Sequence, residues 1–226
     1  MPAAMGVSQP FPMIAPERSV PLAPLTTFKV GGPADYFCSV RSADELRDAL
    51  AFAEEKTLPV FLLGGGSNIL VSDLGFRGLV IRMMLTGRET TTSADTVSFC
   101  VAAGENWDAF VAETVAGGLY DLANLSGIPG SVGAVPIQNI GAYGVEVGDC
   151  IERVETLHRA SGKTEVLERS ACRFGYRDSF FKTTEGKGHI ITYVTFALRR
   201  EHGPNLAYRD VRDYFADWRD PPTPAD

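Results

Sequence analysis

The segment "GIPGSVGAVPIQNIGAYG", residues 127–144, constrains the fold of this chain more than any other stretch. It holds five glycines and two prolines in 18 residues, while the positions between them are mostly apolar. The glycines and prolines exclude a regular helix or strand, and an ordinary surface loop would be richer in Ser, Asp and Lys. Buried irregular backbone leaves unpaired N–H and C=O groups, which cost about 1–3 kcal/mol each. The segment therefore predicts either a loop buried against a large ligand or an Ω-like loop packed on its own side chains.

A second glycine-rich loop, "LGGGSN" at residues 63–68, follows an apolar run that is typical of a buried strand. Consecutive glycines cost folding entropy and are kept where the backbone passes close to another group. Their N–H groups, together with Ser67 and Asn68, would line a concavity suited to phosphate. A plain tight turn between two strands is the alternative. The residue types match neither GxGxxG nor GxxxxGK[ST], so the Rossmann and P-loop motifs are excluded.

The composition excludes several classes of protein. The 226 residues, 45% hydrophobic and 22% charged, fit one large or two modest globular domains. A net charge of −7 argues against a general nucleic-acid or anionic-membrane surface. Four separated cysteines and three histidines show no metal-ligand spacing, so no metal is predicted. We expect reduced, mostly buried thiols in a cytoplasmic protein without a signal peptide or a membrane span.

Hydrophobic periodicity and turn residues predict an α+β fold. Helices are expected at 41–58, where Ser42 and Glu45 have capping-box spacing, and at 106–118, capped by Asn106. A turn is expected at Gly75–Gly78. The expected strands are 36–40, 59–64, 69–72, 79–83, 96–104, 151–158, 163–168 and 188–200, with the pair 151–158 and 163–168 forming a hairpin. The predicted division of the chain is an irregular arm at 1–24, one subdomain at 25–89 and a second at 90–226.

Four stretches together resemble the UDP-N-acetylenolpyruvoylglucosamine reductase family. They are "TTFKVGGPADYF", "LGGGSNILVSDLGFRGLVI", "AGENWDAFVAETVAGGLYDLANLSGIPGSVGAVPIQNIGAYGVEV" and "CRFGYRDSFFK", and they occur in the family's order. The resemblance implies a flavoprotein of bacterial peptidoglycan precursor synthesis. It also implies the two-subdomain FAD-binding fold of the vanillyl-alcohol-oxidase/PCMH type, in which FAD lies extended between two α+β subdomains.

The resemblance also implies cofactors and the residues that bind them. Non-covalent FAD is expected, because neither glycine-rich loop contains a histidine that could be linked to flavin, and NADPH is expected as the reductant. The first subdomain is expected to contact FAD through Gly64, Gly65, Gly66, Ser67, Asn68 and Ile69. The second is expected to contact it through Pro129, Gly130, Val132, Gly133, Ala134, Ile137, Gln138, Asn139, Gly141, Ala142 and Tyr143.

The family's reaction passes hydride from NADPH through FAD to the enolpyruvyl double bond of UDP-N-acetylglucosamine enolpyruvate. Negative charge develops toward the substrate carboxylate, so a cation there binds the transition state more tightly than the ground state. Arg177 in "FGYRDS" matches the family's arginine in this catalytic role, and its planar fork suits a carboxylate. Tyr176 and Tyr208 are expected to contact the substrate. Without the motif, Arg177 would be taken as the salt-bridge partner of Asp178 and Tyr208 as a half-buried strand aromatic.

The chain departs from the family after Arg177. The family uses a serine proton donor in an "NAGSFF"-like motif and an assisting glutamate, both in its carboxyl-terminal third. Here the only serine after Arg177 is Ser179, and the motif does not occur. We therefore expect a monomeric chain that lacks the C-terminal substrate-binding domain and turns over poorly alone. The alternatives are a non-catalytic FAD-binding module and another FAD-dependent sugar or alcohol oxidoreductase of the same fold.

Overall fold

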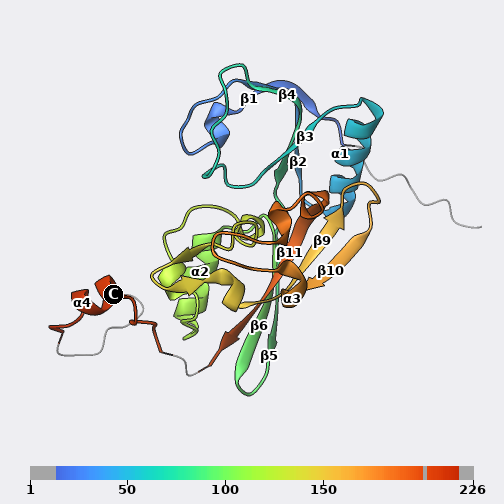
Figure 1. The fold of residues 1–226 in the computed structure, drawn as a ribbon. Helices are drawn as coiled ribbons and strands as arrows, with labels where there is room; N and C mark the ends of the chain where they lie inside the picture. The colour runs from blue at the N-terminus through green and yellow to red at the C-terminus, as the bar shows by residue number, and fades with distance from the viewer. Residues whose placement is uncertain (1–13, 201–202, 219–226) are drawn as a thin grey trace, which may run out of the picture.

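A computed structural model describes residues 14–200 and 203–218, and its strands form two main sheets (Figure 1). Across the first sheet the order is β1 (Glu17–Pro21), β2 (Pro33–Val40), β4 (Phe76–Met83) and β3 (Val60–Leu63). Strands β2 and β3 both pair parallel with β4, while β1 pairs antiparallel with β2 at the edge. Helix α1 (Ala43–Glu55) provides the crossover that parallel pairing requires between β2 and β3.

The second sheet is antiparallel throughout. Across it the order is β10 (Thr164–Glu168), β9 (Ile151–His158), β11 (His189–Arg199), β6 (Thr96–Ala102) and β5 (Arg88–Thr92). Helix α2 (Trp107–Ala116) lies beside this sheet, and the first sheet lies above it in Figure 1. The strands predicted at 36–40, 59–64, 79–83, 96–104 and 188–200 are therefore present with shifted ends. The hairpin predicted at 151–168 is also present, and its first strand has the predicted bounds.

The two long helices begin where their capping residues predict. Ser42 Oγ accepts a hydrogen bond from the Glu45 N–H at 3.1 Å, and Asn106 Oδ1 accepts one from the Ala109 N–H at 2.8 Å. The shorter elements are α3 (Arg169–Cys172), α4 (Arg209–Tyr214), a ribbon of β7 (Gly141–Ala142) with β8 (Val145–Glu146), and 3₁₀ turns at Ala23–Leu25, Ala123–Leu125, Val132–Ala134, Val147–Asp149, Phe180–Lys182 and Gly186–Gly188.

The structure differs from the predicted elements at several places. Residues 17–21 form the edge strand β1 rather than an irregular arm, whose first 13 residues lie outside the described part. Segment 69–72 is not a strand, because Ile69 and Val71 pack their side chains against the first sheet without pairing to it. Gly78 lies inside β4 rather than in a turn. Strand β5 was not predicted, since "RETTT" is polar and mostly exposed.

Buried side chains join the two sheets along one side. Leu46 of α1 and Ile81 of β4 share one apolar cluster with Leu157 of β9 and Ile190 of β11. The Arg47 side chain adds hydrogen bonds from α1 to the β9–β10 hairpin, from Nε to the Gly162 carbonyl at 3.0 Å and from Nη2 to Thr164 Oγ1 at 3.2 Å. The sheets are thus fixed to each other at this side.

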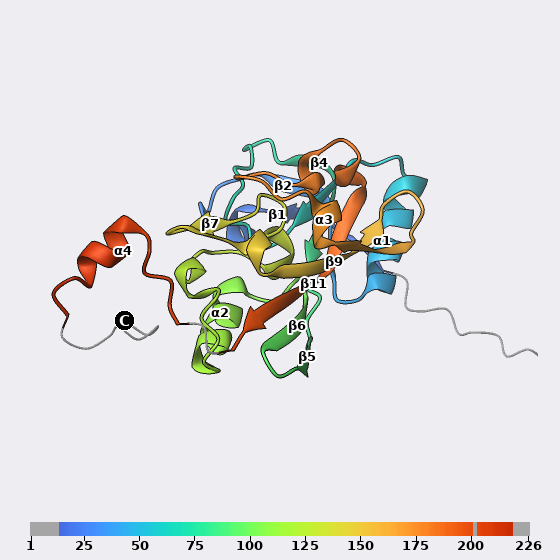
Figure 2. The ribbon, with the colours of Figure 1, turned by 60° about the horizontal axis from the view of Figure 1, so that its bottom comes forward.

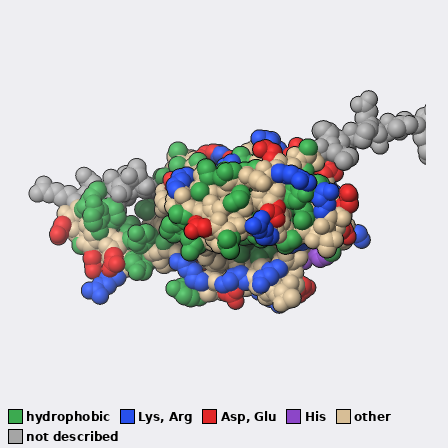
Figure 3. Space-filling model, turned by 90° about the horizontal axis from the view of Figure 1, so that it is seen from above, with side chains coloured by type: hydrophobic (Ala, Val, Ile, Leu, Met, Phe, Trp, Pro, Cys, Tyr) green, Lys and Arg blue, Asp and Glu red, His purple; other side chains and the backbone are tan. Residues whose placement is uncertain are grey.

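The face of the molecule in Figure 3 carries hydrophobic, basic and acidic side chains intermixed. Helix α4 stands apart from both sheets in the two ribbon views (Figures 1 and 2). Within 14–200 and 203–218, every helix falls short of the length and apolar character that crossing a membrane demands.

Candidate functional site

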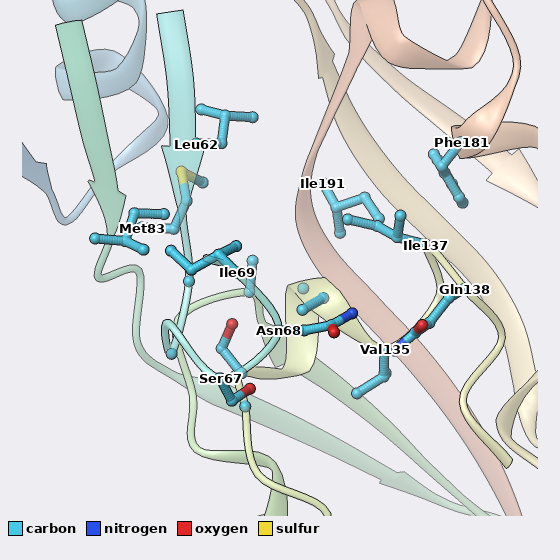
Figure 4. Close-up of a pocket in the computed structure, with 18 of the residues that line it drawn as sticks. Leu62, Ser67, Asn68, Ile69, Met83, Val135, Ile137, Gln138, Phe181 and Ile191 are labelled. Atoms are coloured by element: carbon cyan, nitrogen blue, oxygen red, sulfur yellow. The ribbon is translucent and has the colours of Figure 1, made fainter. Parts of the chain in front are cut away.

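A cleft of about 520 Å³ lies between the two sheets (Figure 4). Leu62, Met83 and Ile69 line one side, and Ile191 and Phe181 line the other. Asn68 points into the space between these walls. A concave site with apolar walls and a few polar groups is the usual form of a cofactor pocket.

The two glycine-rich loops meet at this cleft. The Ser67 hydroxyl of the first loop donates a hydrogen bond to the Pro129 carbonyl of the second at 3.1 Å. A Cβ atom added to Gly64 would lie 2.6 Å from Ser131 Oγ, and one added to Gly65 would lie 3.0 Å from Gly130 Cα. A side chain at 64 would thus meet the Ser131 hydroxyl and one at 65 the Gly130 backbone, because the two loops approach each other closely here.

Several backbone donors at this meeting point are left without a protein acceptor. The N–H groups of residues 65–68 and 130–131 form no hydrogen bond with any residue in the described ranges. The Asn68 side chain likewise has no hydrogen-bond partner there. Successive free N–H groups in a concave loop form a binding place for anions. The loop therefore has the donors that a phosphate or diphosphate needs.

Three basic side chains, which the sequence analysis did not identify, also line the cleft: Lys182, Lys187 and His189. The His189 side chain is only 8% exposed, and its Nδ1 lies 3.2 Å from Thr156 Oγ1 and 3.9 Å from a Glu165 carboxylate oxygen. The Lys182 ammonium donates to the Arg177 carbonyl at 2.8 Å. The cleft thus carries local positive charge although the whole chain is acidic. Within the described residues, no three His, Cys, Asp or Glu side chains gather as a metal site requires.

The structure brings most of the predicted cofactor residues together on the cleft. Those that line it are Gly64, Gly65, Gly66, Ser67, Asn68, Ile69, Pro129, Gly130, Gly133, Ala134, Ile137 and Gln138. They come from segments about 60 residues apart in the sequence, and the contact of the two loops places them on one site.

Other predicted cofactor residues lie away from the cleft lining. Val132 is fully buried in the core of the second sheet. The Asn139 side chain is buried and bonded to protein groups only. Gly141 and Ala142 form β7, and the exposed Tyr143 makes an edge-to-face contact with Tyr208 at 5.7 Å between ring centroids. These positions support the shape of the loop rather than the wall of the cleft.

The predicted substrate residues Tyr176, Arg177 and Tyr208 lie outside the cleft lining, and Tyr208 contacts Tyr143. Tyr176 is 84% exposed, and the neighbouring Arg177 is also exposed. Arg177 Nη2 donates to the Gly141 carbonyl at 2.7 Å, and no carboxylate in the described residues forms an ion pair with this arginine. Asp178 instead lies 3.7 Å from the Lys182 ammonium. The alternative that Arg177 pairs with Asp178 is therefore not what the structure shows.

The apolar part of the cleft was not predicted from the sequence. For the residues of β3 the sequence did contain an indication, because β3 leads directly into the first loop. In sheets with parallel strands, ligands bind beyond the carboxyl ends of the strands. The lining residues from β4 and β11, and Ala103 just after β6, carry no such local signal. The missed lining residues are Phe61, Leu62, Leu63, Met83, Ala103, Ile128, Ser131, Val135, Ile140, Phe181, Gly186, Ile190 and Ile191.

Comparison with known proteins identifies relatives of this chain. A family model described as an FAD binding domain matches residues 34–168. A UDP-N-acetylenolpyruvoylglucosamine reductase from Thermobifida fusca is 45% identical over 184 residues, which cover 81% of this chain and 51% of the relative. The reductase of the same name from Neisseria gonorrhoeae is 46% identical over 192 residues, which cover 84% of this chain and 55% of that relative. The chain spans about half the length of these relatives.

Solved structures extend the comparison to the fold. The MurB reductase from Thermus caldophilus superposes with a TM-score of 0.65 at 30% identity, covering 90% of this chain and 67% of that one. Cholesterol oxidase from Brevibacterium sterolicum superposes with a TM-score of 0.61 at 16% identity, covering 88% and 40%, which shows a shared fold alone. These matches confirm the predicted α+β FAD-binding fold of the vanillyl-alcohol-oxidase type. The chain belongs to the FAD binding domain family and, within it, to the UDP-N-acetylenolpyruvoylglucosamine reductases.

Proposed function

We propose that this chain is the FAD-binding part of an NADPH-dependent reductase that converts UDP-N-acetylglucosamine enolpyruvate to UDP-N-acetylmuramate. The observation that supports the proposal most directly is the meeting of both glycine-rich loops on one cleft, with N–H groups that have no protein acceptor. A plain turn would pair those groups within the protein or leave them to water, whereas here they converge on a cleft with apolar walls.

The residues of the cleft fit FAD. Its diphosphate would accept hydrogen bonds from the free N–H groups of 65–68 and 130–131 and from the Asn68 side chain, while the Ser67 hydroxyl is donated to the Pro129 carbonyl. Its ring systems would pack on the apolar walls that include Leu62, Met83 and Ile191. When bound, FAD supplies the flavin ring that accepts hydride and passes it on.

Arg177 is proposed as the catalytic cation that faces the substrate carboxylate. Only one of its N–H donors is bonded within the described residues, and its side chain is exposed, so a bidentate contact with a carboxylate remains open. Such a contact strengthens as negative charge develops toward the carboxylate, which lowers the barrier. Tyr176 and Tyr208 are proposed to contact the same substrate.

The wider setting is part of the same proposal. NADPH is proposed as the reductant, and the protein is placed as a monomer in the cytoplasm, in cell-wall biogenesis and hence in cell shape and division. The division into subdomains at 25–89 and 90–226 is also proposed. It is supported by the start of the second sheet at Arg88, close to this boundary.

The first experiment is titration of the purified chain with FAD, followed by flavin absorbance. The proposal expects a one-to-one complex whose visible flavin absorption is bleached by NADPH under anaerobic conditions. Recovery of the oxidised spectrum on adding UDP-N-acetylglucosamine enolpyruvate would report the second half of the reaction. A chain that binds no FAD at micromolar concentration contradicts the proposal.

The same experiment separates the two alternatives. A non-catalytic module would bind FAD but keep its oxidised spectrum in the presence of NADPH. A sugar or alcohol oxidoreductase of this fold would be bleached by its alcohol substrate and reoxidised by oxygen rather than by the enolpyruvyl sugar. UDP-N-acetylglucosamine, which lacks the enolpyruvyl double bond, is the matched control for the second step.

A further inference from the structure

The turn that carries Tyr176 and Arg177 is bonded to the loop that lines the cleft. The Asn139 side chain Nδ2 donates to the Gly175 carbonyl at 3.0 Å, and the Ser179 hydroxyl donates to the Ile137 carbonyl at 2.7 Å. Arg177 itself donates to the Gly141 carbonyl. Three hydrogen bonds therefore fix the segment 175–179 to the segment 137–141, and Ile137 is a residue of the cleft wall.

Asn139 is the buried member of this set. Its side chain is 1% exposed, and besides Gly175 it donates to a Glu146 carboxylate oxygen at 2.7 Å. Its Oδ1 accepts the Gly148 N–H at 2.8 Å. Both ends of the amide are thus held by protein, and a buried amide with all its partners present fixes one geometry. The side chain has no donor left for a cofactor, which differs from the role expected for Asn139 from the sequence.

The backbone at these two segments is held in an uncommon conformation. Seven non-glycine residues in the described ranges have positive φ, and four of them are Asn139, Tyr143, Arg173 and Arg177. The φ of Asn139 is 44° and that of Arg177 is 52°. Such conformations cost free energy and persist where the surroundings hold them, most often at functional sites. Asn139 lies on the loop and Arg177 on the facing turn, so each of the two segments holds a conformation that its surroundings must maintain.

We propose that Asn139 is a positioning residue that holds the Arg177 turn on the cleft loop, so that occupation of the cleft by FAD also fixes Arg177. The inference rests on the proposed function for the role of Arg177, but the mechanical link does not. The link runs from the cleft wall at Ile137 and Gln138 to the adjacent Asn139, and from its amide to Gly175. Gly175 and Asp178 close the turn through two mutual hydrogen bonds of 3.0 Å.

The test uses amide hydrogen exchange of Gly175 and Asp178 in the full chain, with and without FAD. In the unsubstituted protein FAD is expected to slow exchange at both amides about tenfold, because the loop and the turn open together. Asn139→Asp removes the donor to Gly175, and adding Glu146→Gln avoids placing two carboxylates side by side. In the double variant the two amides should exchange about tenfold faster than in the unsubstituted protein, and FAD should no longer slow them.

Two further variants keep the test decisive. Ser179→Ala removes the hydrogen bond from the turn to the Ile137 carbonyl. It should also speed exchange at Gly175 and Asp178 and weaken the effect of FAD, to a smaller degree, and it serves as the test if the Asn139 variants do not fold. Asn124→Asp is the matched control, since Asn124 also donates to main-chain carbonyls, but to those of Tyr143 and Asn205. It should leave exchange at Gly175 and Asp178 unchanged. If FAD slows these amides equally with and without the Asn139 donor, the inference is overturned.

A ligand titration then tests whether the link serves Arg177. In the FAD-loaded protein, the preference for UDP-N-acetylglucosamine enolpyruvate over UDP-N-acetylglucosamine reports the carboxylate contact. Removing the Asn139 donor should reduce that preference about tenfold, and should reduce it no further in a protein that already carries Arg177→Ala. An additive loss would show that Asn139 does not act through Arg177. Failure of the unsubstituted protein to bind either sugar would count against the proposed function alone, because the exchange measurement decides the link separately.

Discussion

The two glycine-rich loops look alike in sequence but are held by the protein in different ways. Residues 65–68 of the first loop donate no backbone hydrogen bond within the described chain. In the second loop, the Val132 N–H donates to the Glu105 carbonyl at 2.9 Å and the Gly133 N–H to the Ala103 carbonyl at 2.8 Å. Farther along, the Ile140 N–H donates to the Val135 carbonyl at 3.1 Å. The backbone N–H groups of the first loop are free to bind a ligand, whereas many of those in the second loop donate to protein carbonyls.

The difference shows that burial of irregular backbone has two separate causes here. The interior of the second loop is buried because Val132, Val135 and Ile140 are part of the core of the second sheet. Its hydrogen bonds are then completed by protein groups, as the Ω-like alternative predicts. The loop lines the cleft at 128–131, 133–135, 137–138 and 140, but the N–H groups of 132–135 and 140 already donate to protein carbonyls. A ligand is therefore needed to complete the first loop and the N–H groups of 130–131, and not the whole of both loops.

The largest expected effect is on the free energy of unfolding, when the buried Trp107 that packs with the second loop is replaced. Trp107 is fully buried, its N–H donates to the Gly130 carbonyl at 3.1 Å, and its indole Nε1 donates to the Leu125 carbonyl at 3.0 Å. Trp107→Ala should lower the free energy of unfolding by about 3–5 kcal/mol, as measured by urea denaturation. Trp218→Ala is the control, because this side chain is 45% exposed, and it should change stability by less than about 0.5 kcal/mol. Equal effects would contradict the assignment of the second loop to the core.

The next effect concerns close packing inside the second loop. A Cβ atom at Gly133 would lie 2.6 Å from Ala103 Cβ, so Gly133→Ala should cost about 1–3 kcal/mol of stability. At Gly117, the C-cap of α2, the nearest atom would be 3.4 Å away and φ is −81°. Gly117→Ala should therefore be close to neutral in the same denaturation experiment. A neutral Gly133→Ala would show that the loop yields easily and is not part of a tight core.

A smaller effect is expected in the first loop, and on affinity rather than stability. Asn68 points into the cleft without a protein partner (Figure 4). Asn68→Ala should leave the free energy of unfolding within about 0.5 kcal/mol and raise the Kd for FAD about 3–10-fold, measured by flavin fluorescence. Asn124→Ala, outside the cleft lining, should leave the Kd unchanged. If Asn68→Ala lost stability but kept its affinity for FAD, the first loop would resemble the second in serving the core rather than the ligand.

The smallest expected effect is on the pH dependence of stability, which should differ between the cysteines packed with the second loop and the cysteine packed with the first sheet. Burial and the Asp121 charge raise the pKa of Cys150 to about 12, and burial is the main cause that raises the pKa of Cys172 to about 11. Both pack in the core with the second loop, whereas Cys38, whose pKa burial also raises to about 11, packs with the first sheet.

Because the fold favours the neutral thiols, their stabilising contribution is complete below the unfolded pKa of 9.0 and is lost as pH rises toward 11–12. The thermal midpoint should therefore fall between pH 8 and pH 10.5. Removing Cys150 and Cys172 together, as alanines, should flatten this decline more than Cys38→Ala does. An unchanged decline in the double variant would contradict the pKa shifts.

Local chemistry is what made parts of the fold predictable. Ser42 and Asn106 cap the two long helices as expected, since capping depends on residues within one turn. Segment 69–72 has the composition of a strand but no partner strand, and strand pairing is decided by distant parts of the chain. The polar strand β5 was missed for the same reason, because its pairing with β6 stabilises it.

The site divides in a similar way. Glycine, Ser67 and Asn68 indicated a phosphate loop because the residue types themselves describe the chemistry. Lys187 and His189 reach the cleft only because β11 lies in the middle of the second sheet, and no spacing in the sequence reveals that order. Asn139 was expected at the cofactor from the resemblance, yet its amide is directed to Gly175 and Glu146.

The apolar layer that joins α1 to the second sheet has a consequence for ligand selection. Met83 and Ile190 belong to this layer and also reach the cleft, whereas Leu46 and Leu157 lie behind them. The spacing of the two walls is therefore set by the volume of side chains that no ligand would touch. Smaller or larger side chains in this buried layer would change the width of the cleft. They would thereby change which nucleotide binds, although no residue of the binding surface is altered.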